Sequence, residues 1–512
     1  MSNHSIIRIA KELADIQKGS DLSLAVACRD IDVRKVQAII IGPPDTPYEF
    51  GFFDFAIKFG KEYPAKAPNV IATTTNGGRC RFNPNIYAQG KVCLSILGTW
   101  RGERGEEWSS AQGLESILIS IQSLMSSNPY ENEPGFELAK DARDRRDQKD
   151  YIAKIRHETL RESLPCSPPS DDANSDFEFL EESLIPFEPF RDLCKRRFLW
   201  YYESYLSAIE KARKEVQDGQ FFARMPFEGD GNEMEGKFNY TELEKRLKLI
   251  RKTLDSETAH WATEGLLSQE RESGVAANLQ RQFEQVVEAY KKDQSVTLDI
   301  ELEEKNPFVW NITYFGRPMT NLDGGLFRIK LHFSPRFPEE QPRAKFETSL
   351  FHHRIGLDGT PCYTPKRPED VKSHIESIIE ALEEESPPYD PRTLVNLEAG
   401  KLFWGSIDDK KTYHRRLRRS VQSSMEILLA LTNCSALWVQ SKQLNPIPTL
   451  SHFISAIAKQ GVYQEILRPI IITLAGPEVC FHIQARFSIL FHNIDLVEMR
   501  WFDSDWLEEL II

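Results

Sequence analysis

Cysteine is scarce in this sequence of 512 residues, and none of its eight cysteines belongs to a C-x-x-C pair. They are scattered along the chain: Cys28, Cys80, Cys93, Cys166, Cys194, Cys362, Cys434 and Cys480. Paired spacing is typical of cysteine zinc sites, and regular spacing in a short chain is typical of disulfide frameworks. The scatter argues against both, so each cysteine is by default a small buried hydrophobic residue.

Long apolar runs and an excess of positive charge are also missing. The N-terminus has no apolar stretch long enough for a signal peptide, and the run near PIIITLAG is far too short to span a membrane. The 64 basic residues are outnumbered by 77 acidic ones, which argues against a nucleic-acid-binding surface. We therefore expect a soluble protein of the cytoplasm, the nucleus or both, with no membrane or nucleic-acid partner.

An internal repeat is the most informative feature that is present. Two segments of 27 residues, which begin at Gly42 and Gly316, align without a gap. They read GPPDTPYEFGFFDFAIKFGKEYPAKAP and GRPMTNLDGGLFRIKLHFSPRFPEEQP, and their matching glycines and prolines lie 274 positions apart. A helix with an apolar stripe is predicted just upstream of each copy, over 6–18 and 279–292. This pattern indicates one fold that occurs twice.

Apolar periodicity predicts an α+β fold for each copy. In the first copy the strand-like runs LSLAVAC, KVQAIIIG and FFDFAIKFG follow the helix. Further along, AQGLESILISIQSLMSS predicts a helix, and a charged helix is expected from about residue 137 to residue 161. We expect an antiparallel meander packed against helices in both copies.

Four regions are predicted along the chain. The first copy occupies 4–160 and the second 277–424. Between them, 165–276 holds a linker rich in Pro, Ser, Asp and Asn, followed by a helical insert. The last region, 425–512, has no counterpart in either copy and is expected to be an α/β extension, because it mixes helix-like and strand-like runs.

Cys93 lies shortly after an Asn-Pro-Asn turn in the segment RFNPNIYAQGKVCLSIL. Packing, metal binding and catalysis are competing roles for it. A cysteine hydrolase would need a histidine base, yet no histidine lies between His4 and His157. No second metal ligand lies at a suitable spacing. A thioester carrier receives an acyl group that is already activated, so it needs mainly a donor for the oxyanion, such as the Asn85 amide.

The region 4–160 carries an ordered set of motifs: RIAKELADI, GPPDTPYEFGFF, YPAKAP, FNPNIYAQGKVCLSIL, WSSAQ and NPYENEPG. In these motifs and their order it resembles the catalytic core of ubiquitin-conjugating enzymes, called the UBC fold. The family's His-Pro-Asn signature is here Asn83-Pro84-Asn85. The ILGTW…WSSAQ insertion and NPYENEPGFE are most similar to the larger Z-type branch, which also carries Asn at the first position.

The resemblance implies that Cys93 accepts ubiquitin, or a ubiquitin-like modifier, from an activating enzyme as a thioester. It then passes the modifier to a substrate lysine or to a ligase. Asn85 would stabilise the oxyanion, and Glu131 or Glu133 would stand near the incoming lysine. No motif for a bound cofactor or metal is recognised, and ATP is consumed by the activating enzyme. The alternative is a non-enzymatic adaptor of UBC-like folds that binds ubiquitin or a ligase.

Partner surfaces are also implied by the resemblance. Arg8 and Lys11 match the basic face of the first helix that meets the activating enzyme, although ordinary solvated helix charge explains them equally well. Two positions depart from the ligase-binding loops of the family: Ala65 follows the Tyr-Pro pair, and Ser110 replaces a proline. A small contact residue weakens a binding hot spot, so standard ligase binding is expected to be weakened.

The second copy resembles the same fold more weakly. Cys362 occupies the position of the nucleophile, ten residues after the start of its tripeptide, as in the first copy. That tripeptide reads His352-His353-Arg354, so an arginine replaces the amide. A non-catalytic docking fold and a second thioester site at Cys362 are both considered. Zinc binding by the two histidines and Cys362 is disfavoured, because these are only three ligands with a wide gap between them.

Overall fold

The computed structural model describes residues 2–19, 21–29, 31–102, 105–138, 140–164, 187–229, 234–269, 274–292 and 297–441. Both copies and the insert between them belong to one compact unit, residues 1–427. Most of the predicted linker and the predicted extension beyond residue 441 lie outside the described residues.

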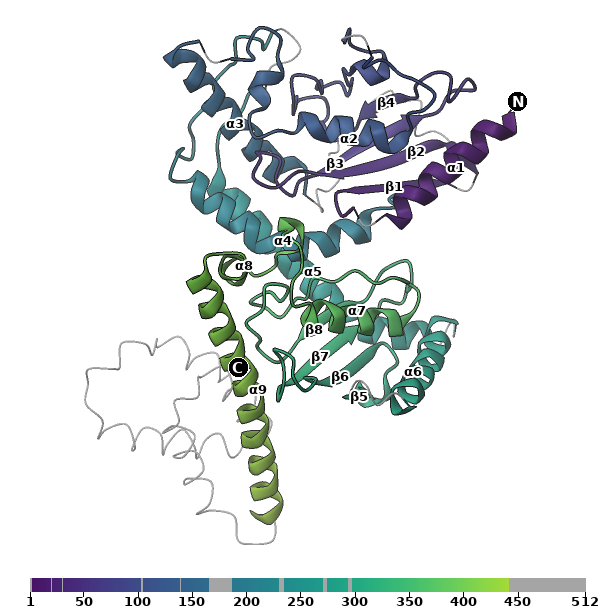
Figure 1. Ribbon diagram of the computed structural model, residues 1–512, viewed down its shortest axis with the longest axis vertical. Helices are drawn as coiled ribbons and strands as arrows, with labels where there is room; N and C mark the ends of the chain where they lie inside the picture. The colour runs from purple at the N-terminus through teal and green to yellow at the C-terminus, as the bar shows by residue number, and fades with distance from the viewer. Residues whose placement is uncertain are drawn as a thin grey trace, which may run out of the picture. The chain divides into compact units, whose positions relative to one another are not determined.

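The first copy is built around a four-stranded antiparallel meander in the order β1-β2-β3-β4 (Figure 1). The strands are β1 (Leu24–Arg29), β2 (Asp32–Ile41), β3 (Phe52–Lys58) and β4 (Asn69–Ala72). The helices are α1 (Ser2–Lys18), α2 (Leu114–Leu124) and α3 (Ala142–Glu162), with short 3-10 turns η1 (Ser95–Leu97) and η2 (Pro129–Asn132). Alternate residues of β2 and β3 share one core with the apolar stripes of α1 and α2. This arrangement follows from the side-chain period of two residues in a strand and of 3.6 residues in a helix.

The second copy repeats this plan with a meander in the order β5-β6-β7-β8 (Figure 1). The strands are β5 (Thr297–Leu302), β6 (Val309–Phe315), β7 (Leu326–His332) and β8 (Arg343–Phe346). The helices are α6 (Gly274–Lys292), α7 (Val371–Glu383), α8 (Leu397–Phe403) and α9 (Ile407–Ser441), with 3-10 turns η3 (Glu303–Lys305) and η4 (Pro391–Thr393). The α+β prediction is confirmed for both copies.

Strand register shows how closely the two copies match. Ile40 of β2 pairs with Phe53 of β3, and Tyr314 of β6 pairs with Phe327 of β7. Each partner in the second pair lies 274 positions after its counterpart, and the same offset holds from the first to the last strand. The repeat predicted over 27 residues therefore extends through the whole meander.

The two repeats each begin with a glycine, and the same structural reason explains both. A Cβ on Gly42 would lie 1.8 Å from the carbonyl oxygen of Tyr48, and a Cβ on Gly316 would lie 1.8 Å from that of Leu322. No other residue fits so close an approach of two backbones.

The charged helix of the first copy begins later than the sequence predicts. The side chain of Asp141 accepts hydrogen bonds from the backbone N–H groups of Arg143 and Asp144. This N-cap satisfies two of the donors that a helix leaves free at its start, so α3 begins at Ala142 rather than near residue 137.

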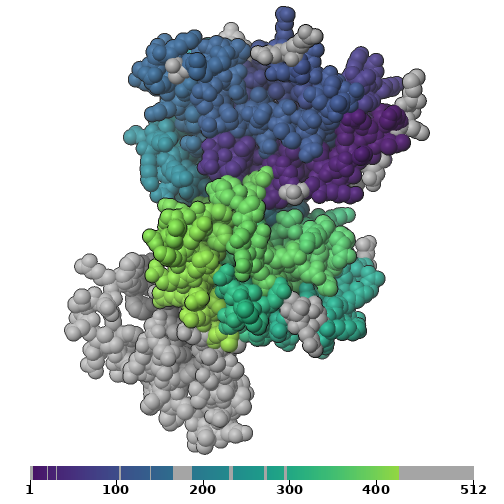
Figure 2. Space-filling model, viewed as in Figure 1, coloured from purple at the N-terminus to yellow at the C-terminus, as the bar shows by residue number. Residues whose placement is uncertain are grey.

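The helical insert packs on the outer face of the first sheet. Its main helices are α4 (Arg191–Ala212) and α5 (Tyr240–Gln269). The ring of Tyr201 stacks on that of Phe50 at 4.1 Å, and the Tyr205 hydroxyl donates to the Phe50 carbonyl at 2.8 Å. Figure 2 shows the teal surface of the insert directly against the blue surface of the first copy. The insert therefore completes the first copy.

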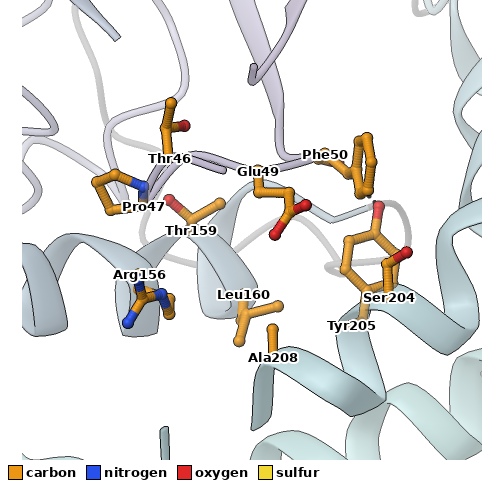
Figure 3. Close-up of a pocket in the computed structure, with 10 residues that line it drawn as sticks. All are labelled: Thr46, Pro47, Glu49, Phe50, Arg156, Thr159, Leu160, Ser204, Tyr205 and Ala208. Carbon is orange, nitrogen blue, oxygen red and sulfur yellow. Dashed lines mark hydrogen bonds between the residues drawn. The ribbon is translucent and has the colours of Figure 1, made fainter. Parts of the chain in front are cut away.

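A small cavity marks this junction (Figure 3). The loop between β2 and β3 contributes Glu49, α3 contributes Arg156, and α4 contributes Ser204. Burial raises the pKa of the Glu49 carboxyl, and Arg156 opposes the rise. At about 10 Å³ the cavity has room for one water molecule at most, so it is a packing detail of the junction.

Candidate active site

The Asn-Pro-Asn turn is fixed by a buried asparagine. The Asn83 side-chain oxygen accepts a hydrogen bond from the Asn85 backbone N–H at 2.9 Å. Its amide nitrogen donates to the Tyr48 hydroxyl at 3.0 Å and to the Leu124 carbonyl at 2.8 Å. Asn83 is fully buried, so its hydrogen bonds tie the turn to the core and to the end of α2.

Cys93 and Asn85 are joined by two hydrogen bonds. The Cys93 backbone N–H donates to the Asn85 carbonyl at 2.8 Å, and the Asn85 amide donates to the Cys93 carbonyl at 3.0 Å. The turn therefore places the predicted oxyanion donor next to the predicted nucleophile. Only 4% of Cys93 is exposed, yet the residue lines an open cleft.

Loops that follow the sheet and α2 form the walls of this cleft. The lining residues are Pro84, Asn85, Tyr87, Cys93, Trp100, Glu131, Asn132, Glu133, Pro134 and Glu137. Three of these lining residues are glutamates, and the same set contains no lysine or arginine. An incoming amine would therefore meet carboxylates and no lysine or arginine among these lining residues.

The two predicted acidic residues both reach the cleft but differ in their surroundings. Glu131 is exposed and accepts a hydrogen bond from the Asn128 amide at 2.7 Å. Glu133 is half-buried and pairs with Arg81 at 3.3 Å. Burial raises the pKa of the Glu133 carboxyl, and the Arg81 guanidinium opposes that rise.

Sequence reasoning missed three residues around the cleft: Arg81, Trp100 and Glu137. Arg81 and Trp100 stand in the motifs RFNPN and ILGTW, so their place beside the turn and the cysteine was a usable signal. Glu137 gave no such signal, because it was expected to begin a helix and instead lies in the loop before α3.

The two residues of the predicted basic face of α1 differ in their surroundings. Arg8 donates to Glu12 at 2.7 Å and to the Gln112 carbonyl at 2.8 Å, which joins α1 to the loop before α2. Lys11 is exposed. Contact of both with an activating enzyme stays a prediction.

The predicted ligase-binding loops lie side by side. The Trp108 indole N–H donates to the Pro64 carbonyl at 2.8 Å, and its ring contacts that of Tyr63 at 5.9 Å. Ala65 and Ser110 are both exposed next to this contact. The two positions therefore share one surface, and their use by a ligase stays a prediction.

The second copy keeps the backbone of the site. The Cys362 N–H donates to the Arg354 carbonyl at 2.8 Å, as Cys93 does to Asn85. The Arg354 N–H donates to His352 Nδ1 at 3.1 Å, so His352 takes the role of the Asn83 side chain. The turn and the cysteine are thus superposable in their hydrogen bonding.

The surroundings of Cys362 differ completely. It belongs to the buried cluster formed by α3, α4, α5 and the outer face of the first sheet, and only 2% of it is exposed. Burial raises the pKa of the Cys362 thiol to about 11, although Arg354 and Arg197 of α4 oppose the rise. The Arg354 guanidinium is held by Glu384 at 3.0 Å. The insert therefore covers the face that the first copy leaves open.

The two histidines of this tripeptide serve packing. His353 stacks on Phe403 at 4.5 Å and hydrogen-bonds the Tyr413 hydroxyl at 3.2 Å. Burial lowers the pKa of His352 to about 3. Within the part of the chain that the structure describes, no three His, Cys, Asp or Glu side chains are gathered so as to hold a metal ion.

Comparison with known proteins identifies the fold. A model of the family "Ubiquitin-conjugating enzyme" matches residues 8–159 and again residues 278–398. This chain belongs to the ubiquitin-conjugating enzyme family. Its two matches lie in the two copies, which confirms that the second copy is a UBC-like fold as well.

Relatives extend the likeness beyond the first match. "Ubiquitin-conjugating enzyme E2 Z" from Homo sapiens is 42% identical over 246 residues, which is 48% of this chain and 62% of the relative. The Xenopus tropicalis protein of the same name is 41% identical over 249 residues, 49% of this chain and 72% of the relative. "Dual E2 ubiquitin-conjugating enzyme/E3 ubiquitin-protein ligase BIRC6" from Homo sapiens is 39% identical over 163 residues, 30% of this chain and 3% of the relative.

These alignments confirm the resemblance to the Z-type branch. The chain spans less than two thirds of the length of the human E2 Z. The aligned length exceeds the first family match. None of the described helices is both long and apolar enough to cross a membrane.

Proposed function

We propose that this protein is a ubiquitin-conjugating enzyme that carries ubiquitin, or a ubiquitin-like modifier, as a thioester on Cys93. The observation that carries the proposal is the Cys93 cleft, where the Asn85 amide donates to the Cys93 carbonyl and three glutamates line the walls. These are the groups that thioester transfer to an amine requires, and a hydrolytic histidine is missing from the lining.

The first step is transfer between two thiols. The Cys93 thiolate attacks the carbonyl carbon of the modifier's C-terminal thioester on the activating enzyme. A new C–S bond forms to Cys93, and the old C–S bond breaks and releases the activating enzyme's cysteine as a thiolate. Because the acyl group arrives activated, no strong base is needed beside Cys93.

The second step forms the isopeptide bond. The neutral amine of a substrate lysine attacks the thioester carbonyl, the carbonyl oxygen becomes an oxyanion, and collapse releases the Cys93 thiolate. An amide nitrogen carries two N–H groups. Asn85 uses one on the Cys93 carbonyl, and we assign the other to the oxyanion. Glu133 or Glu131 receives the proton of the attacking amine.

The second copy, in this proposal, performs no transfer. Cys362 is covered by the insert, and Arg354, which replaces the amide donor, is engaged with Glu384. Its role is to bind the insert and the first copy. An ion pair of Arg392 in η4 with Asp21 in the first copy, at 2.7 Å, supports that role.

Partner contacts follow the same scheme. Lys11 on the exposed face of α1 would meet the activating enzyme, with Arg8 holding the helix in place. Ala65 and Ser110 would meet a ligase weakly, because both side chains are small. Activity in the cytoplasm or nucleus, where the modifier is activated, fits this scheme.

The test is a charging assay with activating enzyme, ATP and ubiquitin. The wild type should form an adduct that a reducing agent removes, and Cys93→Ser should form a stable oxyester. An adaptor without a nucleophile would form neither. If ubiquitin fails as a donor, ubiquitin-like modifiers with their own activating enzymes are tested in the same way; no adduct with any of them rejects the proposal.

A further inference from the structure

Arg81 is a buried cation directly behind the Cys93 cleft. Its side chain is 6% exposed. The guanidinium donates to the Pro84 carbonyl at 2.6 Å, inside the turn that carries Asn85. The same nitrogen donates to the Glu133 carboxylate at 3.3 Å. One side chain thus links the turn of the predicted oxyanion donor to one of the two candidate proton acceptors.

Two aromatic rings lie close to this guanidinium. It lies 4.5 Å from the ring centre of Tyr87, which lines the cleft, and 5.9 Å from that of Phe227 in the insert. Phe227 in turn packs against Tyr130 beside Glu131. Cation–π contacts of a desolvated arginine are favourable and directional, so the guanidinium has little freedom to move.

The second copy provides a natural comparison. A phenylalanine precedes each tripeptide, Phe82 in the first copy and Phe351 in the second. The residue before it is Arg81 in the first copy and Leu350 in the second. Leu350 is buried in the apolar core of its copy. Core packing at this position therefore needs no charge, and the arginine occurs in the copy whose cysteine opens into an acidic cleft.

We infer that Arg81 is a positioning residue for the reaction at Cys93, which holds Glu133 and the Asn85 turn in the geometry of lysine attack. The inference rests on the proposed function. A group held within a fraction of an ångström of its working place accelerates a reaction by orientation, without touching the reacting atoms.

Loss of Arg81 has a defined effect on proton transfer. The charged and titratable groups around Glu133 include Arg81, Tyr87, Cys93, Glu131 and Glu137, and Arg81 is the only cation among these described groups. Burial already raises the pKa of Glu133, and removal of Arg81 raises it further. Glu133 is an effective base only above its pKa. Without Arg81, the acidic limb of the pH profile of discharge should therefore move to higher pH.

The experiment measures single-turnover discharge of the charged full-length protein to free lysine between pH 6 and pH 9. We expect Arg81→Leu, the residue of the second copy, to charge but to discharge more slowly by about 10- to 100-fold. Its acidic limb should shift to higher pH. Arg81→Lys keeps the positive charge and should recover part of the discharge rate. In the Glu133→Gln variant, the additional change Arg81→Leu should not move the acidic limb of the pH profile.

The matched control is Arg343→Leu, because Arg343 is also buried and paired, with Asp192 at 2.7 Å, but lies in the second copy. It should lower thermal stability without changing discharge. If Arg81→Leu lowers stability as Arg343→Leu does and keeps the wild-type rate and pH profile, the inference is wrong. A wild type that never charges would reject the proposed function itself.

Discussion

Cys93 and Cys362 occupy the same position in two copies of one fold, and the comparison separates what the fold determines from what its neighbours determine. Each cysteine donates its backbone N–H to the third residue of its tripeptide at 2.8 Å. Cys93 then opens into a cleft of glutamates, whereas Cys362 is covered by α4. We therefore expect that a cysteine at the nucleophile's position is not sufficient for transfer, and that the face in front of it must also be open.

The largest effect is expected at the two cysteines themselves. Cys93→Ala should abolish ubiquitin charging, while Cys362→Ala should charge at the wild-type rate. Charging is measured by the shift of the protein on non-reducing gels. Loss of charging in Cys362→Ala without loss of stability would show that the second copy takes part in the chemistry.

Substitution of the amide should have the next largest effect. Asn85→Ala removes the proposed oxyanion donor, and loss of one such donor costs about 100-fold or more in rate. We expect discharge to lysine to fall by that order in single-turnover assays. The exchange Arg354→Asn gives the second copy an amide at this position. When it is combined with Cys93→Ala, we still expect no charging at Cys362. Charging in that double variant would mean that the tripeptide, not the covering helix, silences Cys362.

Uncovering Cys362 tests the role of the insert. Tyr201 stacks on Phe50 within the cluster that contains Cys362, and truncation of a buried aromatic residue costs about 3 kcal/mol. Tyr201→Ala should lower stability and raise the alkylation rate of Cys362 at least tenfold by mass spectrometry. Its neighbour Tyr202 is half-buried, so Tyr202→Ala should change the stability and the alkylation rate of Cys362 less. Equal labelling in the two variants would refute the covering role.

The pH dependence of alkylation tests the burial of Cys362 further. Only the thiolate reacts. Because burial raises the pKa of Cys362 to about 11, its rate should rise about tenfold per pH unit up to pH 9.5 without a plateau. A plateau below pH 9 would contradict the buried position of this thiol.

The smallest effect is expected at the surface between the copies. Arg392 and Asp21 form an ion pair that solvent reaches, and such pairs contribute about 0.2–1 kcal/mol. Arg392→Ala should therefore reduce the free energy of unfolding by no more than this, and less in high salt. A loss of several kcal/mol would assign this pair a larger part in holding the copies together.

The sequence predicted the architecture well, because a period of two or of 3.6 residues directly reports which face of a strand or helix is buried. The 274-residue offset seen in the repeat also relates the paired strands of the two sheets. The resemblance to the family grouped Cys93, Asn85, Glu131 and Glu133, and all four line one cleft. Helix starts were less certain, because Asp141 caps α3 through side-chain hydrogen bonds that periodicity does not register.

The sequence could not predict the different fates of the cysteines. That difference comes from α4, which lies 150 or more residues before Cys362 in the chain and covers this cysteine in the folded protein. Arg81 stands in the RFNPN motif beside the turn, but its pairing with Glu133 could not be predicted, for a similar reason. Its partner Glu133 is 52 positions away, and no local pattern connects the two.

The most direct test is to locate the thioester by mass spectrometry. The full-length protein is charged with ubiquitin under single-turnover conditions and digested at low pH, where thioesters persist. We expect one modified cysteine, Cys93, and an unmodified Cys362. Ubiquitin on Cys362, or on both residues, would contradict the claim that an open face decides which copy carries the modifier.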